Sequence, residues 1–156
     1  MATVHSLDWR TIIVRGIIAG LIGAVLIDAF LYAVMLMPNH APITTLWQFV
    51  ASTLLGKAAF ADINTAWLGL FMHLAVSIGW AVAFSYAAHT RPNVPAHPYI
   101  SGLVYGVIVM ILMQIVELAA NIPANFTVPG LLTGLIAHTI FYGLPVSLTI
   151  ARAMRT

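Results

Sequence analysis

Three ionisable residues, Asp28, His73 and His138, lie deep within long apolar stretches of this chain. Counting a rise of about 1.5 Å per helical residue from the ends of those stretches places all three about 12 to 13 Å below one membrane surface. An ionisable group at the centre of a membrane helix costs about 2.5 to 3.5 kcal/mol, so such groups should face the interior of a helix bundle and pair there. The sequence therefore predicts one shared polar layer.

This layer has the residue types needed to handle protons or ions. Histidine titrates near neutral pH, and a neighbouring carboxylate favours its protonated form. Asp28, His73 and His138 could therefore relay protons, with Gln114 somewhat shallower and Glu117 nearer the periplasmic surface, where it would feed the layer. The alternative is a structural pair that holds helices together.

Two further interpretations use the same histidines as ligands. His73 and His138, at equal depth, could supply both axial ligands of a haem or another tetrapyrrole. Gly69 and Gly134 each lie four residues earlier on the same helical face and would leave room for a flat macrocycle. Alternatively, the two histidines and Asp28 could hold a divalent metal ion.

Composition places the protein in a membrane. Of its 156 residues, 62% are hydrophobic and 6% are charged, whereas soluble domains are about one quarter charged. A soluble fold of this size could not bury so much apolar surface. The net charge of +2 is small and dispersed, so nucleic acid is not an expected partner. Cysteine is absent, which excludes disulfides and thiolate chemistry. For the function, we favour a non-enzymatic protein.

Four stretches are long enough to cross a bilayer, which takes about 20 mostly apolar residues. They are residues 11–37, 65–88, 99–120 and 129–153, and segments rich in proline and asparagine separate them. The sequence thus predicts an all-α fold, a polytopic four-helix transmembrane bundle forming a single domain over residues 1–156.

The basic residues predict the orientation, because lysine and arginine near helix ends are retained in the cytoplasm. Five of the six fall on one side of the predicted bundle, and only Lys57 falls on the other; the five are Arg10, Arg15, Arg91, Arg152 and Arg155. We therefore expect a multi-pass protein of a bacterial inner membrane with both termini in the cytoplasm.

The segment 45–60 is apolar but too short to span, which predicts a helix lying at the periplasmic interface, with a re-entrant hairpin as the alternative. Thr45 and Gln48 fit a capping box at its start. Trp47, like Trp9 and Trp67, falls near a predicted membrane surface, where tryptophan commonly serves as an anchor.

An internal repeat indicates two similar two-helix halves. Small-residue spacings recur in the first and third spans, and a Gly-x-x-x-His pattern recurs in the second and fourth; the glycines are Gly16, Gly20, Gly102, Gly106, Gly69 and Gly134. Two spans per half would give both halves the same orientation. Such glycines allow close helix packing.

The glycine-rich first span with its late Asp28, together with residues 48–60 and 68–73, resembles small uncharacterised bacterial inner-membrane proteins of unknown function. The resemblance implies a bacterial plasma-membrane location and carries over no site. The expected partner is the lipid bilayer. Because four helices with short loops bury little of one another's surface, we also expect contact with other membrane subunits or with a second copy of this chain. A small subunit of a larger membrane complex is therefore the second functional hypothesis.

Overall fold

The computed structural model describes residues 8–122 and 127–155, which form helices and turns with no strand among them. Four helices are long and apolar enough to cross a membrane: Trp9–Asn39, Thr65–Thr90, Pro98–Ala119 and Val128–Ala153. A helix satisfies all its backbone hydrogen bonds internally, which lipid cannot do for it. These four helices indicate a multi-pass membrane protein.

The first span consists of α1 (Trp9–Leu31), the π-helical η1 (Tyr32–Leu36) and the 3₁₀ turn η2 (Met37–Asn39). A short helix, α2 (Thr44–Leu55), and a second 3₁₀ turn, η3 (Gly56–Phe60), lead to α3 (Thr65–Thr90). One turn of helix, α4 (Asn93–Ala96), precedes α5 (Pro98–Ala119). The last span combines α6 (Val128–Ile136), the π-helical η4 (Ala137–Gly143) and α7 (Leu144–Ala153).

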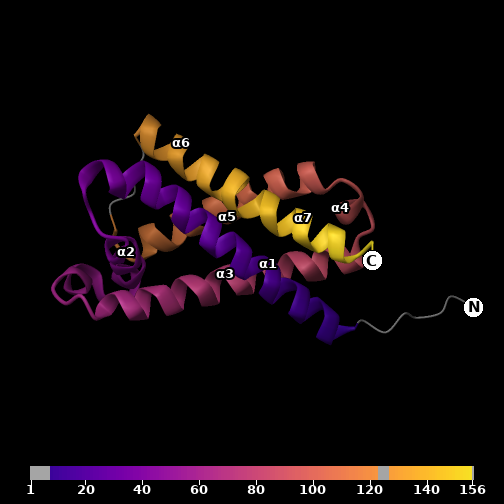
Figure 1. Cartoon of the computed structure of the whole chain (residues 1–156), viewed down its shortest axis with the longest axis horizontal. Coiled ribbons are helices and arrows are strands. Elements are labelled where there is room, and N and C mark those ends of the chain that lie inside the picture. The colour runs from indigo at the N-terminus through magenta and orange to yellow at the C-terminus, as the bar shows by residue number, and fades with distance from the viewer. Residues whose placement is uncertain (1–7, 123–126, 156) are drawn as a thin grey trace, which may run out of the picture.

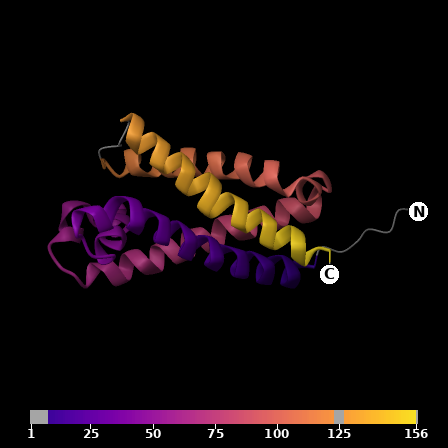
Figure 2. The same ribbon diagram turned by 45° about the horizontal axis from the view of Figure 1, so that its top comes forward.

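The spans pack as two pairs, α1 with α3 and α5 with the α6–η4–α7 helix, which Figure 2 shows as two layers. Contacts of α1 with η4 and α7 join the pairs. The beginning of α1 and the end of α7 lie at one end of the bundle, and α2 lies at the other, packed on α3 (Figure 1). Arg10 and Arg15, near the start of α1, therefore share one end of the bundle with Arg152 and Arg155, near the end of α7. This end is named here the arginine end.

Glycine brings the backbones of α1 and α3 into contact. A Cβ atom built on Gly16 would lie 2.6 Å from the Cα of Val82, and one on Gly20 would lie 2.7 Å from the Cα of Ile78. Both separations are far below normal carbon contacts. Any larger residue at these positions would push the two helices apart.

The second pair of spans is packed in the same way. A Cβ atom on Gly102 would lie 2.9 Å from the carbonyl oxygen of Gly143, and one on Gly106 would overlap the carbonyl oxygen of His138. The glycines of α5 therefore hold the π-helical segment that carries His138 directly against α5.

Proline explains the π-helical segment of the last span. Pro145 has no N–H to donate to the carbonyl of Phe141, four residues earlier. The N–H of Leu144 instead donates to the carbonyl of Thr139, five residues back, which widens the turn. The other π-helical segment, η1, ends two residues before Pro38. The helix thus continues through Pro145 into α7.

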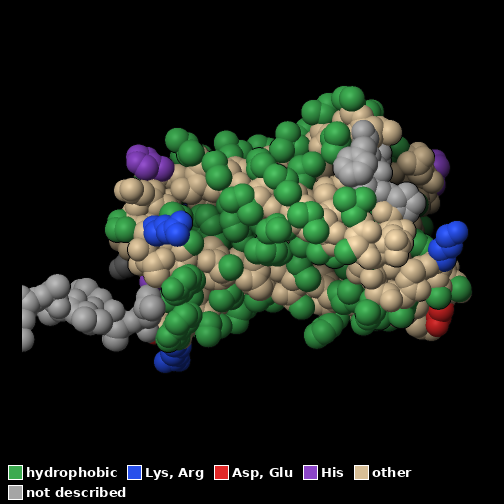
Figure 3. Space-filling view, turned by 180° about the vertical axis from the view of Figure 1, so that it is seen from behind, with side chains coloured by type: hydrophobic (Ala, Val, Ile, Leu, Met, Phe, Trp, Pro, Cys, Tyr) green, Lys and Arg blue, Asp and Glu red, His purple; other side chains and the backbone are tan. Residues whose placement is uncertain are grey.

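The outer surface agrees with a membrane environment. In the space-filling view, charged side chains lie at the two ends of the visible face, and hydrophobic side chains cover much of the band between them (Figure 3). Every span also contributes large exposed apolar residues, among them Val25, Phe71, Ile111 and Leu132. Exposed apolar surface on this scale is what a lipid-facing bundle presents.

The predicted capping box at the start of α2 is wrong. The residue preceding α2, Ile43, makes no side-chain cap, and Gln48 is buried. The Gln48 amide donates to the carbonyl oxygens of Ala59 at 3.2 Å and Asp62 at 3.1 Å. A buried amide must find partners, and the loop before α3 supplies acceptors that the start of α2 does not.

We predict that Gly69→Ala destabilises the bundle, because a Cβ atom there would overlap the backbone carbonyl of Trp47 on α2. Overpacking of this kind costs about 1 to 3 kcal/mol. Gly79→Ala, on the same helix α3, is the matched control, because a Cβ atom at Gly79 meets no atom within 4 Å. Thermal unfolding in detergent measures both, and equal stability of the two variants would contradict the tight contact between α2 and α3.

Candidate functional site

An acid and a base meet between α1 and α3. The Nε2 atom of His73 lies 3.1 Å from Oδ1 of Asp28, and the two side chains are 17% and 15% exposed. Among the described residues, neither of these two atoms has a hydrogen-bond partner apart from the other. The separation is within the range over which two groups can share a proton.

A third helix completes the surroundings of the carboxylate. The indole Nε1–H of Trp47, on α2, donates to Oδ2 of Asp28 at 3.0 Å. The sequence pattern suggested a surface anchor, whereas the indole is partly buried and holds the acid. A partly buried indole N–H needs an acceptor, but residue spacing could not show that the acceptor would come from α1.

His138 lies across a small cavity from this pair. Its Nδ1 lies 2.8 Å from the carbonyl oxygen of Gly134, so Nδ1 carries the proton and Nε2 has a free lone pair. His73 and His138 both line a cavity of about 60 Å³, together with Ser77, Trp80, Met113 and Tyr142. A water molecule occupies about 30 Å³ in the liquid, so the cavity has room for one or two.

Gln114 and Glu117 form a separate pair on α5. The Gln114 amide donates to Oε2 of Glu117 at 3.1 Å, and the Oε1 atom of Gln114 has no partner among the described residues. Neither side chain lines the cavity between the histidines. The structure thus brings Asp28 and His73 into contact, places His138 on a cavity that His73 also lines, and leaves the other two predicted site residues apart.

Two tyrosines that the sequence did not single out as site residues bind the backbone of α3 beside the cavity. The hydroxyl of Tyr142 donates to the carbonyl of Ser77, and that of Tyr105 donates to the carbonyl of Trp80, each at 2.5 Å. Tyr142 follows His138 by four residues within η4, and both side chains line the cavity. The four-residue spacing of His138 and Tyr142 places both side chains on the same side of the helix, and it was the signal in the sequence that could have marked Tyr142 as a site residue.

A tetrapyrrole between the two histidines does not fit this geometry. The cavity of about 60 Å³ is several times smaller than the roughly 300 Å³ or more of ordinary ligand sites. Gly69, expected to leave space for a macrocycle, instead packs against the backbone of Trp47. The Nε2 atom of His73, which would bind iron, is paired with Asp28.

A metal site of the three residues has no support either. Over residues 8–122 and 127–155, no three histidine, aspartate or glutamate side chains are grouped so that they could hold a metal ion. His138 shares the cavity with His73, but its contacts are with the helix backbone and not with Asp28.

Fold and site together indicate a class, a multi-pass helical membrane protein with a partly buried acid–base pair between its first two spans. Compared with known proteins, the chain matches no family model, no curated protein and no solved structure.

We predict energetic coupling between Asp28 and His73. His73→Ala should cost less in an Asp28→Ala background than in the parent, with a coupling of about 0.5 to 3 kcal/mol, as residues in contact show. His138→Ala is the control, because its hydrogen bond is to Gly134, and its effect should add to that of Asp28→Ala within about 0.5 kcal/mol. Unfolding in detergent measures the cycle, and additivity of the Asp28 and His73 variants would contradict a shared site.

Proposed function

We propose that this protein is a non-enzymatic membrane protein that takes up and transfers protons through the Asp28–His73 pair. The observation that carries the proposal is the 3.1 Å separation of a carboxylate and an imidazole, both largely buried. Such a pair can hold one proton while remaining neutral overall, because the proton placed on either group leaves no net charge. Gaining or losing a proton then gives a net charge to a site shielded from water, and such a charge is costly there. A neighbouring group that takes or supplies the proton is therefore needed.

His138 is the acceptor that the geometry offers. Its free Nε2 can take a proton from water in the cavity that it shares with His73. With room for one or two water molecules, the cavity supports transfer between the two imidazoles without direct contact. Tyr142 borders the same cavity and holds η4 against α3.

Polar side chains continue from the cavity toward the arginine end, which supports transfer beyond the layer. His73, Ser77, Ser85 and His89 recur at multiples of four residues along α3. Residues four apart are neighbours on a helix, but each step of four turns by about 40°, so the series winds about 160° around α3 between His73 and His89. Ser77 and Ser85 are buried at 6% and 0% exposure, and the Ser85 hydroxyl has no partner among the described residues. Ala81 occupies the one apolar position in this series. The hydroxyls of Tyr105 and Tyr142 bind backbone carbonyls of α3 within the turn that precedes Ala81.

The series ends at a contact with α1. The Nδ1 of His89 donates to the Ser85 carbonyl at 2.8 Å, which leaves Nε2 to accept a hydrogen bond from Nη1 of Arg15 at 3.2 Å. Histidine commonly serves as a proton shuttle, so His89, beside the bundle end, is a suitable exchange point between the buried groups and solvent.

We propose that the bundle lies in a bacterial inner membrane with the arginine end in the cytoplasm and α2 at the periplasmic side. The rule that arginine is retained in the cytoplasm supports this orientation. The close glycine contacts within each pair of spans support the hypothesis of two similar halves.

We expect purified protein in liposomes to conduct protons when a pH difference and a potential are imposed, as reported by a trapped pH-sensitive dye. Asp28→Asn should abolish the flux, because an amide cannot carry the proton. Asp62→Asn, the same exchange at an exposed aspartate, should leave it unchanged. Parent protein that conducts no faster than empty liposomes would overturn the proposal.

Single-cysteine labelling tests the orientation, since the natural chain contains no cysteine. In intact cells, a cysteine replacing exposed Ala58 or Ala61 near Lys57 should react with a membrane-impermeant maleimide. One replacing exposed Asn93, near Arg91, should react only after the membrane is opened. The reverse pattern would place the arginine end outside.

A further inference from the structure

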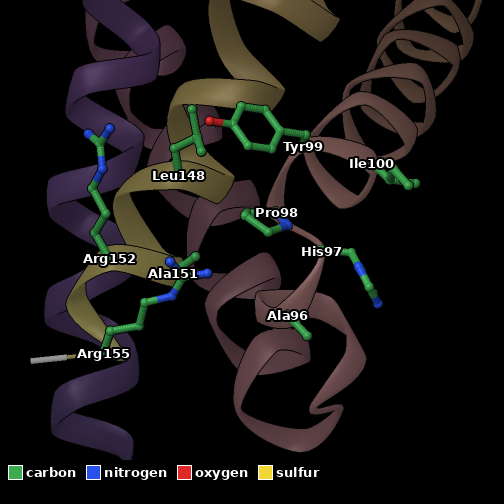
Figure 4. Close-up of a pocket in the computed structure, with 9 residues that line it drawn as sticks. All are labelled: Ala96, His97, Pro98, Tyr99, Ile100, Leu148, Ala151, Arg152 and Arg155. Atoms are coloured by element: carbon green, nitrogen blue, oxygen red, sulfur yellow. The ribbon is translucent and has the colours of Figure 1, made fainter.

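We infer that a pocket at the arginine end binds the phosphate group of an anionic phospholipid. The pocket has a volume of about 490 Å³ and lies between the end of α7 and the α4–α5 junction (Figure 4). Its volume falls within the range of ordinary ligand sites, about 300 to 1,000 Å³. It is far from the Asp28–His73 pair and independent of the proton-transfer proposal.

Cationic side chains give the pocket its ligand preference. Arg152 of α7 and Arg155, two residues beyond the end of α7, line it together with His97, and no acidic residue is among its lining residues in the described part of the chain. Figure 4 shows the Arg155 side chain extending past Ala151 in the direction of Pro98, whereas the Arg152 and His97 side chains extend outward on opposite sides. A guanidinium binds phosphate oxygens through parallel hydrogen bonds, which makes arginine well suited to this group.

The wall opposite α7 is held in place by hydrogen bonds. The Ser147 hydroxyl of α7 donates to the carbonyl of Pro98 at 2.8 Å, and the Ser101 hydroxyl donates to the carbonyl of Val94 at 2.9 Å. These bonds fix the start of α5 against both α7 and α4. The pocket is therefore a structured feature of the bundle end and not a gap between loose arginine side chains.

The apolar part of the lining favours a lipid over a free phosphate ion. Tyr99 and Ile100 line the pocket and are 65% and 66% exposed, and Leu148 faces them from α7. Because they lie where spanning helices reach the bundle end, acyl chains could follow this apolar surface while the phosphate contacts Arg155. Basic pockets between membrane helices bind anionic lipid head groups in this manner.

The test uses the full chain in nanodiscs containing phosphatidylcholine with a small fraction of phosphatidylglycerol. Native mass spectrometry measures the phosphatidylglycerol retained after release from the disc. We expect retention to exceed that of phosphatidylcholine, and its binding constant to fall about fivefold in Arg155→Gln and up to about 25-fold in Arg152→Gln/Arg155→Gln. Arg10→Gln is the matched control, an exposed arginine at the same end that does not line the pocket.

Three outcomes would overturn the inference. Equal losses in Arg10→Gln and Arg155→Gln would indicate general attraction to the basic end. Equal retention of the two lipids by the parent would exclude a preference for anionic head groups. Competition by millimolar inorganic phosphate, with no preference for the lipid, would assign the pocket to a soluble anion. Unchanged thermal unfolding of the double variant shows that it remains folded.

Discussion

A carboxylate placed within a membrane-spanning helix must find partners inside the protein, and much of this structure follows from that requirement. Asp28 of α1 is met by His73 from α3 and by the Trp47 indole from α2. Leaving such a group in lipid would cost several kcal/mol. The need to satisfy one acid thus draws three helices together and places a titratable pair where water has little access.

Close backbone contact is the second condition for this arrangement. Gly69, four residues before His73 on α3, lets α3 approach α2 at the position of Trp47. Without that approach, the indole could not reach Asp28 while His73 also does so. In the other pair of spans, Gly106 packs against the carbonyl of His138, and the π-helical turn caused by Pro145 carries His138 and Tyr142 to the shared cavity. Packing and proline chemistry therefore position the groups on which proton transfer would depend.

The two ends of the bundle serve different physical purposes. At the end holding α2, hydrogen bonds from Gln48 join the short helix to the loop before α3. At the arginine end, Arg15 meets His89, and the pocket between α7 and α5 presents positive charge beside apolar surface. Two buried serines of α3, Ser77 and Ser85, lie between them, so the interior of this small bundle is not uniformly apolar.

The sequence by itself determined the four apolar spans, because crossing a bilayer imposes a length and a composition that can be counted. It also placed Asp28 and His73 at one depth, since helical rise is constant. Only the tertiary structure decided that Trp47 donates to Asp28, that Gln48 binds the following loop, and that Gln114 and Glu117 pair apart from the cavity. Rise along a helix gives the depth of a residue. Which residues of two helices touch depends instead on how each helix is rotated about its axis, and the glycine and proline contacts between helices set that rotation. The spacing of residues within one helix does not contain this information.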